Sequence, residues 1–329
     1  MNSINNIMSS ETNKKNEFDF IQEQLRPLTY GKKEARNLID DCAFFNNVKG
    51  LTISVDSSIE GVHVPTGTAI EIQSKRSVLR ALSDLAAFGA KPLCVFIAIN
   101  LPKGIKHQFL EKISLGLEIV LSEYNIFLAG GDISSYEGPV SFSVTVVGEK
   151  AGKISGRSGA KKGDLVVMTG NLGDAYMGRM LIQNNNYNID KKETKDLINK
   201  FYNPLPRINL GMKVNKYATS IIDISDGFLS ELRHICINSK VGALINIDKL
   251  SLSKVVKSLI NIKKVKYFDI LTGGDDYELL YTINPINIAR LDDESSVIGQ
   301  IVEGSEIKIL DKNSLALKFE NKELGYKHF

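Results

Sequence analysis

The sequence predicts a mixed α/β fold with α+β character, arranged as two domains. Short apolar runs bounded by Gly, Pro, Asn and Asp alternate with helical patterns along most of the chain, and hairpin-like strand pairs also occur. The 329 residues are 43% hydrophobic and 24% charged, which is an ordinary globular composition for one large domain or two average ones. Because hairpins mix with the alternating pattern, we do not expect a strictly doubly wound sheet.

The expected strands follow the apolar runs at residues 51–55, 93–101, 126–129, 141–148, 164–169, 220–224, 243–247 and 279–283. The clearest helix covers residues 74–88, where apolar side chains recur at helical spacing and Gly89 supplies a stop. Similar patterns predict helices at residues 18–26, 106–124, 174–183, 192–202, 206–215 and 227–239.

A domain boundary is expected in residues 149–162, a stretch rich in Gly, Ser and Lys after a β-like run. Residues 1–16 are polar and lack an apolar signal-peptide core, so we expect a flexible N-terminal tail. The predicted domains are therefore residues 17–150 and 151–329, with no convincing internal repeat between them.

Charge and cysteine content exclude several classes of protein. The formal net charge of +3, without a clustered basic face, argues against nucleic-acid binding. The longest strongly apolar stretch, residues 93–101, is far shorter than the roughly 20 residues of a membrane span. The three cysteines are far apart and form no Cys-x-x-Cys, so we expect neither a disulfide framework nor a zinc site, and a reducing, cytoplasmic location fits best.

Aspartates mark the places where apolar strands or helices end, and one stands within the apolar helix. They are Asp40, Asp41, Asp56, Asp84, Asp132, Asp223, Asp226, Asp275 and Asp276. A charge near a core is costly unless it is paired or bound to metal. Mg²⁺ prefers hard oxygen ligands and is usually held by one or two carboxylates plus substrate phosphates, so the pattern favours magnesium–nucleotide chemistry in a cleft.

Structural roles compete with this interpretation. Asp is commonly a turn or helix-capping residue, above all beside Gly, and this alternative applies to Asp40 or Asp41, Asp226 and Asp275. Asp84 has the alternative of an exposed helix edge, where it would pair with Arg80 four residues earlier. Arg157 lies in a polar loop and is either solvated or reaches a phosphate, and His63 is either structural or contacts an acceptor.

Glycine turns offer backbone amides to phosphate. Gly130-Gly131 follows a predicted strand, and Gly170-Asn-Leu-Gly173 precedes a predicted helix whose N-terminus favours anions. No Walker, Rossmann or zinc-protease motif occurs, so these turns are weak signals by themselves.

The order and spacing of the motifs resemble the thiamine-monophosphate kinases, whose fold superfamily includes aminoimidazole ribonucleotide synthetase. The motifs are Asp-Asp-Cys-Ala at 40–43, Glu-Gly-Val-His at 60–63, Leu-Ser-Asp-Leu-Ala-Ala-Phe-Gly-Ala-Lys-Pro at 82–92, Ala-Gly-Gly-Asp at 129–132, Arg-Ser-Gly-Ala-Lys-Lys-Gly-Asp at 157–164, Thr-Gly-Asn-Leu-Gly-Asp at 169–174, Ile-Asp-Ile-Ser-Asp-Gly at 222–227, Leu-Thr-Gly-Gly-Asp-Asp-Tyr-Glu-Leu at 271–279 and Gly-Tyr-Lys-His-Phe at 325–329. The match covers nearly the whole chain after about residue 30.

The resemblance implies ATP-dependent phosphorylation of thiamine monophosphate to thiamine diphosphate, with several Mg²⁺ ions and direct in-line transfer. It implies a homodimer formed through the N-terminal domain, and a C-terminal domain that completes the active-site cleft. The implied metal contacts are Asp41, Ser54, Val55, Asp56, Asp84, Asp132, Asp223 and Asp226, with Asp132 and Asp223 also catalytic. The implied ATP contacts are Gly131, Arg157 and Ser225, and the implied substrate contacts are His63, Asp275 and Tyr326.

Three places depart from the family pattern. The lead into the first Asp pair is Asn-Leu-Ile-Asp-Asp at 37–41 instead of Gly-rich. Val55 stands where a hydroxyl residue is usual, so a metal contact there must use backbone or Ser54. Asp275 replaces Glu and reaches one methylene less far. Two alternative functions stay open. The chain could be another ATP-using enzyme of the same superfamily or a catalytically weak nucleotide-binding sensor.

Overall fold

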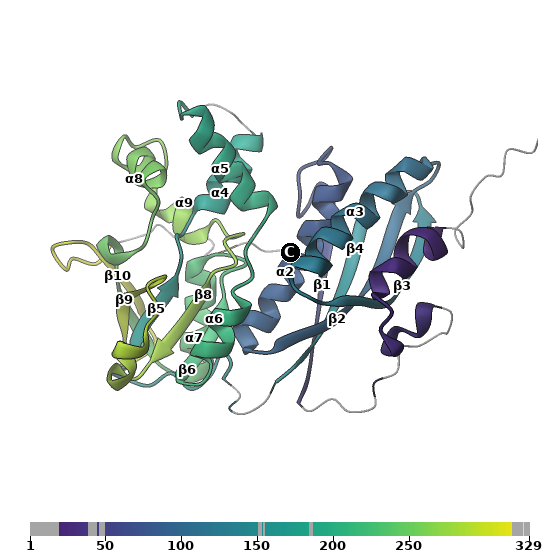
Figure 1. The fold of residues 1–329 in the computed structure, drawn as a ribbon. Coiled ribbons are helices and arrows are strands. Elements are labelled where there is room, and N and C mark those ends of the chain that lie inside the picture. The colour runs from purple at the N-terminus through teal and green to yellow at the C-terminus, as the bar shows by residue number, and fades with distance from the viewer. Residues whose placement is uncertain are drawn as a thin grey trace, which may run out of the picture.

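The structure is a computed structural model that describes residues 20–38, 45, 50–150, 153, 155–183, 187–317 and 325. Two β-sheets, one from each half of the chain, lie side by side, and helices pack on them (Figure 1). Within the described part of the chain, none of the helices has the length and apolar character of a membrane-spanning segment.

The first sheet has four strands in the order β1-β4-β2-β3. All pairs are antiparallel except β2 and β3, which are parallel and joined through helix α3 (His107–Glu123). The strands are β1 (Leu51–Ile59), β2 (Lys91–Pro102), β3 (Phe127–Tyr136) and β4 (Ser141–Glu149). Short helical turns precede the sheet at η1 (Ile21–Leu25), η2 (Arg26–Thr29) and η3 (Lys33–Leu38).

The second sheet has six strands in the order β10-β7-β9-β5-β8-β6, antiparallel except for β10 and β7. The strands are β5 (Leu165–Thr169), β6 (Ala218–Asp223), β7 (Gly242–Asn246), β8 (Leu279–Ile283), β9 (Ser295–Val302) and β10 (Ile307–Leu310). The helices of this half are α4 (Asp174–Gln183), α5 (Lys191–Tyr202), α6 (Ile208–Val214), α7 (Phe228–Ser239), α8 (Lys254–Asn261) and α9 (Tyr267–Thr272), with short turns η4 (Ile247–Lys249) and η5 (Pro285–Arg290).

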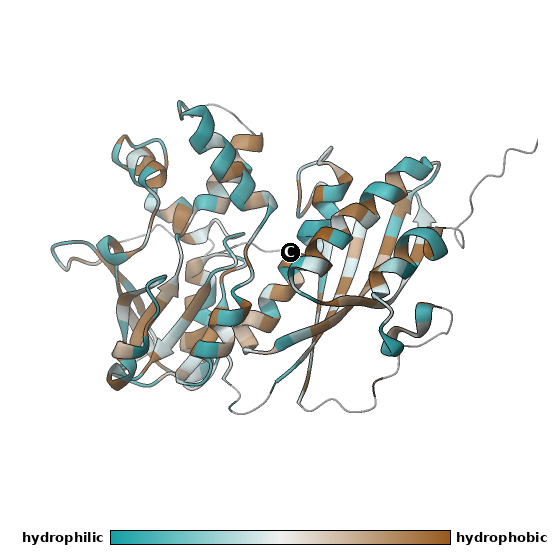
Figure 2. Cartoon of the chain, in the orientation of Figure 1, coloured by the Kyte–Doolittle hydropathy of each residue, from teal (hydrophilic) through white to brown (hydrophobic). Residues whose placement is uncertain are grey.

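Helix α2 (Ile70–Phe88) joins the two halves, because it packs on the first sheet and also on β6 and α6. It ends at Gly89, whose backbone has a left-handed φ of 67° and whose N–H bonds the carbonyls of Ala86 and Leu85. One hydrophobic core runs from Leu82 of α2 to Val144 of β4 and on to Tyr281 of β8. Figure 2 shows brown and teal alternating along α2 and α3, as expected for amphipathic helices.

The open face of the first sheet is the face turned away from α2 and α3. It carries Leu51, Ile53 and Val55 of β1, whose side chains are 56%, 55% and 64% exposed. Their neighbours Ser54 and Asp56 alternate to the helix side, because successive residues of a strand point to opposite faces.

The predicted elements are largely present. The helix predicted at 174–183 and the strand at 279–283 have the observed bounds, and the helix predicted at 74–88 begins four residues earlier, at Ile70. The sequence prediction missed β9, β10, α8 and α9. The predicted mixed α/β fold is confirmed, whereas the tail at 1–16 and the domain limits 17–150 and 151–329 stay predictions.

Candidate active site

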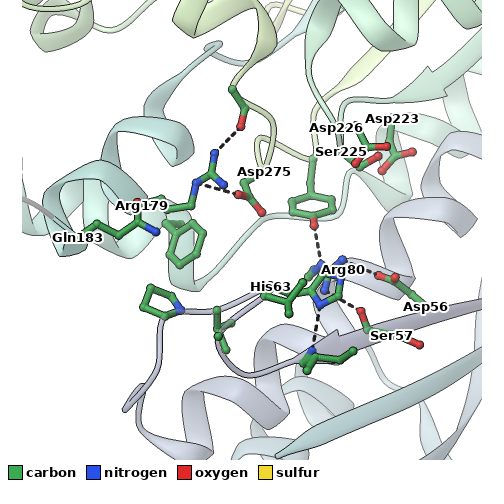
Figure 3. Close-up of a pocket in the computed structure, with 18 of the residues that line it drawn as sticks. Asp56, Ser57, His63, Arg80, Arg179, Gln183, Asp223, Ser225, Asp226 and Asp275 are labelled. Atoms are coloured by element: carbon green, nitrogen blue, oxygen red, sulfur yellow. Dashed lines mark hydrogen bonds and ion pairs between the residues drawn. The ribbon is translucent and has the colours of Figure 1, made fainter. Parts of the chain in front are cut away.

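Two cavities meet at the junction of the sheets. The first cavity, of about 690 Å³, is lined by Asp56, Asp84, Asp223, Asp226 and Asp275 together with His63, Ser225, Arg80 and Arg179 (Figure 3). The second cavity, of about 650 Å³, is lined by Ser54 and Arg157 among others. Asp84 and Asp223 line both cavities, so this pair of carboxylates stands where the two spaces join.

Asp84 projects from α2 toward β1. Its Oδ2 atom accepts a 2.5 Å hydrogen bond from the Ser54 hydroxyl. Burial raises the pKa of Asp84, the Ser54 hydroxyl opposes the rise, and the charge of Asp56 adds to it. The predicted alternative of an exposed helix edge is therefore not what the structure shows.

Asp223 is the last residue of β6 and is 5% exposed. Its Oδ2 atom accepts a 2.7 Å hydrogen bond from the Ser83 hydroxyl of α2. Burial, and then the charge of Asp84, raise the pKa of Asp223 to about 7. Two neighbouring carboxylates, half-buried Asp84 and buried Asp223, each with a hydroxyl partner, favour the approach of a cation.

Glu231 of α7 belongs to the same acidic group, although the sequence did not single it out. It is 3% exposed, and its Oε1 atom accepts a 3.4 Å hydrogen bond from the Asp226 amide. Burial, and then the charges of Asp223 and Asp226, raise the pKa of Glu231 to about 8. Its only sequence signal is its place one helical turn after Gly227, which is too weak to predict a site.

The loop at 224–226 is held by the loop that precedes β8. The Asp275 amide donates a 2.8 Å hydrogen bond to the Ser225 carbonyl, and the Tyr277 amide donates one of the same length to Ile224. Gly274 has a φ of 69°, and a Cβ atom there would stand 2.6 Å from the Ser225 carbonyl oxygen. Asp275 and Tyr277 also have positive φ values, so this loop stores backbone strain beside the cavity.

Three arginines that were not predicted as site residues from the sequence, Arg76, Arg80 and Arg179, form a basic group beside the first cavity. Arg76 of α2 is fully buried and donates to Oδ1 of Asp275 at 2.6 Å and to the Phe201 carbonyl. Arg179 contacts Oδ2 of Asp275 at 3.5 Å. Arg80 lies one turn after Arg76 and pairs with Asp56 at 3.5 Å. Their partners lie far away in sequence, which is why the motif pattern did not reveal them.

The predicted substrate and ATP contacts are distributed over both cavities. His63 lies in the first cavity, and its Nδ1 atom accepts a 3.0 Å hydrogen bond from the Ile59 amide, so the proton of the neutral ring is on Nε2. Asp275 and Ser225 also lie in the first cavity, while the exposed Arg157 lines the second.

Asp132 and Gly131 do not join this group within one chain. In register, Asp56 pairs with Val144, Val144 with Ile97, and Ile97 with Gly131. Three strand spacings of about 4.8 Å therefore separate β1 from β3, or roughly 14 Å. Asp132 follows Gly131 and is exposed on the open face, so within one chain it is apart from the other aspartates, and its metal and catalytic roles stay predictions.

Gly131 has a packing role that explains its residue type. A Cβ atom there would stand 2.1 Å from the Ile97 carbonyl oxygen, so only glycine fits between β3 and β2. The Val55 side chain likewise points to the open face, which leaves only its backbone for a metal contact. Asp41 and Tyr326 lie outside the described residues.

The donor set fits a hard divalent cation. It consists of carboxylate and hydroxyl oxygens, which Mg²⁺ prefers. No group of three His, Cys, Asp or Glu side chains within the described ranges is arranged to hold a metal ion by itself. Since Mg²⁺ in phosphoryl-transfer sites takes only one or two carboxylates and completes its shell with water and phosphate oxygens, the pair Asp84 and Asp223 suffices on the protein side.

Comparison with known proteins places the chain in a family. Residues 39–150 match the model of the AIR synthase related protein, N-terminal domain. The chain is 35% identical over 309 residues to the thiamine-monophosphate kinase of Buchnera aphidicola subsp. Schizaphis graminum. The aligned region covers 91% of this chain and 94% of the relative. The chain belongs to the thiamine-monophosphate kinase family.

Solved structures agree with this membership. The structure of AaThiL complexed with AMPPCP and TMP has a TM-score of 0.75 and 29% identity, and the match covers 85% of this chain and 87% of that one. The hydrogenase maturation protein HypE in complex with ATP also has a TM-score of 0.75, but at 14% identity it shares the fold alone. The kinase family, and not the wider superfamily, is therefore the relevant comparison for the site.

Proposed function

We propose that this protein transfers the γ-phosphoryl group of ATP to the phosphate of thiamine monophosphate, giving thiamine diphosphate. The observation that carries the proposal is the pair Asp84 and Asp223, which stands where two cavities meet. A donor in one cavity and an acceptor in the other would meet at this pair. A relative of the same family has been solved with AMPPCP and TMP together.

The second cavity suits ATP and the first suits the acceptor. Arg157 lies in the second cavity, where a guanidinium favours phosphate, while His63 and Asp275 lie in the first. Ser225 lies beside Asp223 and Asp226, at the point where the triphosphate would cross between the cavities. Tyr326, which lies outside the described residues, remains a predicted contact for the thiazolium ring.

Magnesium ions would be held by Asp56, Asp84, Asp223 and Asp226, with Ser54 and Ser83 orienting two of these carboxylates. When bound, Mg²⁺ screens the charge of the phosphates and of the carboxylates. Arg157 adds fixed positive charge on the nucleotide side. Asp41, the backbone of Val55, and the number of ions follow from the family resemblance and remain predictions.

The chain itself needs neither a covalent nucleophile nor a general base. An acceptor phosphate is largely ionised near neutral pH, since its second pKa is about 6. Its oxygen attacks the γ-phosphorus in line, while the bond from that phosphorus to the β–γ bridging oxygen breaks and ADP leaves. The protein orients the two substrates, and the closely packed loops at 224–226 and 274–277 hold the acidic side chains in place.

We further propose a homodimer formed through the open face. Leu51, Ile53 and Val55 expose an apolar strip there, which a second copy would cover. Asp132 and Gly131 lie on the far edge of the same sheet, so a metal or ATP role for them requires approach from across this face. A cytoplasmic location stays a prediction.

The deciding experiment is conversion of thiamine monophosphate to thiamine diphosphate by the purified protein with ATP and Mg²⁺. Controls omit the acceptor, replace it with thiamine, or add EDTA. Product that depends on both metal and acceptor supports the proposal. Binding of ATP without any product would favour the alternative of a catalytically weak nucleotide-binding sensor.

A further inference from the structure

Helix α2 presents three charged residues on one stripe. Arg76, Arg80 and Asp84 recur every four residues, so they lie on the same helix face, which turns toward the second half of the chain. Asp84 belongs to the acidic pair at the cavity junction. Arg80 therefore stands one helical turn from the place where phosphoryl transfer is proposed.

Arg80 is held in a fixed position. Its Nε atom donates a 2.6 Å hydrogen bond to the Tyr277 hydroxyl, and its Nη1 atom donates a 3.0 Å hydrogen bond to the Ser57 carbonyl. The side chain is 10% exposed, and Figure 3 shows it beside Asp56 and Ser57 in the first cavity. A guanidinium carries five N–H donors, so these two bonds leave donors for an anion in the cavity.

The charges of this basic group favour an anion. The guanidinium groups of Arg76, Arg80 and Arg179 contact two carboxylates, those of Asp56 and Asp275. Arg76 is fully buried behind the residues that line the cavity, and with its charge included three positive and two negative charges leave a net charge of +1 in this group. The same cavity is also lined by Asp84, Asp223 and Asp226, where the structure favours cations.

We propose that Arg80 binds the phosphate group of the acceptor and directs it toward the Asp84 and Asp223 pair. The inference rests on the proposed function, because it takes the first cavity as the acceptor site. Arg80 is a substrate-binding residue in this view, and Tyr277 positions its guanidinium. Arg80 and Asp84 are four residues apart on α2, or about 6 Å along the helix axis, so a phosphate bound by Arg80 would be on the same helix face as the acidic pair.

The test compares thiamine monophosphate with thiamine, which lacks the phosphate. Dissociation constants for both are measured by isothermal titration calorimetry with Mg²⁺ and AMPPCP present. The dissociation constant for thiamine divided by that for thiamine monophosphate reports the contribution of the phosphate. In Arg80→Leu we expect this ratio to fall about 10-fold or more, as for a lost charge-assisted hydrogen bond, while thiamine affinity and the KM for ATP stay near wild type.

Two further variants separate binding from folding. Arg80→Lys keeps the charge but loses the planar fork, so we expect it to recover part of the ratio. Arg290→Leu removes an exposed arginine far from both cavities and should leave the ratio unchanged. Circular dichroism and the melting temperature check that each variant folds; if Arg80→Leu does not fold, Arg80→Lys alone decides through a ratio below wild type.

The outcomes distinguish this proposal from the proposed function. A wild-type protein that neither phosphorylates thiamine monophosphate nor prefers it to thiamine would reject the function itself. The inference would be overturned if the wild-type protein phosphorylates thiamine monophosphate and prefers it to thiamine, but the Arg80 variants keep the wild-type ratio of dissociation constants. Variants that bind both ligands equally more weakly would also keep this ratio, and Arg80 would then have a structural role.

Discussion

The hydroxyl of Ser83 donates a 2.7 Å hydrogen bond to Oδ2 of Asp223, which links α2 of the first half to the end of β6 in the second. Ser83 is fully buried and Asp223 nearly so. The bond joins two elements from opposite halves of the chain at the carboxylate pair between the cavities. A small polar side chain thus fixes the position of a proposed metal ligand.

Ser83→Ala should lower the free energy of unfolding by about 1–3 kcal/mol, because a buried carboxylate oxygen loses its hydrogen-bond partner. Urea unfolding at neutral pH without added metal measures the change. Ser258→Ala, on the exposed side of α8, is the matched control and should change stability little. Equal stability of Ser83→Ala and wild type would mean that this bond contributes nothing net.

Asp223→Asn should remove the stabilisation that magnesium and nucleotide give to the protein. Adding Mg²⁺ with AMPPCP is expected to raise the melting temperature of wild type but not of the variant, since a ligand that binds only the folded state stabilises it. Without metal the variant should be as stable as wild type or more so, because the repulsion between Asp84 and Asp223 is gone. Turnover should fall by more than the roughly 10–100-fold typical of outer metal partners. If Mg²⁺ with AMPPCP raises the melting temperature of the variant as much as that of wild type, Asp223 is not a metal ligand.

Asp276→Asn should flatten the dependence of stability on pH. Burial raises the pKa of Asp276 well above its ordinary value of 3.8, although the amides of Gly173 and Ala175 donate to its carboxylate. Between the unfolded and folded pKa values the native state binds a proton that the unfolded state has lost, so stability falls as pH rises through this window. Asparagine cannot titrate and still accepts hydrogen bonds. The free energy of unfolding of the variant should therefore fall less than that of wild type as the pH rises from 4. Urea unfolding at a series of pH values measures both profiles, and parallel profiles would contradict the expectation.

Ile53→Lys should break the proposed dimer. A lysine in the middle of the apolar strip on β1 would place a charge in the interface. Size-exclusion chromatography with light scattering should give about twice 36.4 kDa for wild type and about 36.4 kDa for the variant. Ile286→Lys changes an isoleucine that is 85% exposed elsewhere and is the matched control. A monomeric wild-type protein would reject the open face as an interface.

Local patterns predicted most of the fold because they coincide with burial. The apolar stripe of residues 74–88 and the run at 279–283 are buried where the pattern placed them. The strand β9 was missed because Gly299 and several half-buried polar residues interrupt its apolar pattern. Helices α8 and α9 are short, with eight and six residues, so few repeats of the helical period were present to detect.

The acidic half of the site could be predicted, and the basic half could not. Asp84 and Asp223 stand at unusual places for a charge, which makes each conspicuous in the sequence alone. Arg80 looks like an ordinary helix residue until Tyr277, almost two hundred positions later, is seen to hold it. For Asp132 the sequence could not reveal the direction of the side chain, which the alternation of β3 turns to the open face.

The hydrophobic core that continues through α2 determines how the protein unfolds. Leu82 and Val144 of the first half and Tyr281 of the second belong to one buried cluster, so the loss of α2 would uncover apolar side chains of both sheets. The segment between Glu149 and Leu165 therefore links two halves that depend on each other for their stability. Heating should melt them together in one cooperative transition, and proteolytic cleavage within this segment should leave the fragments associated.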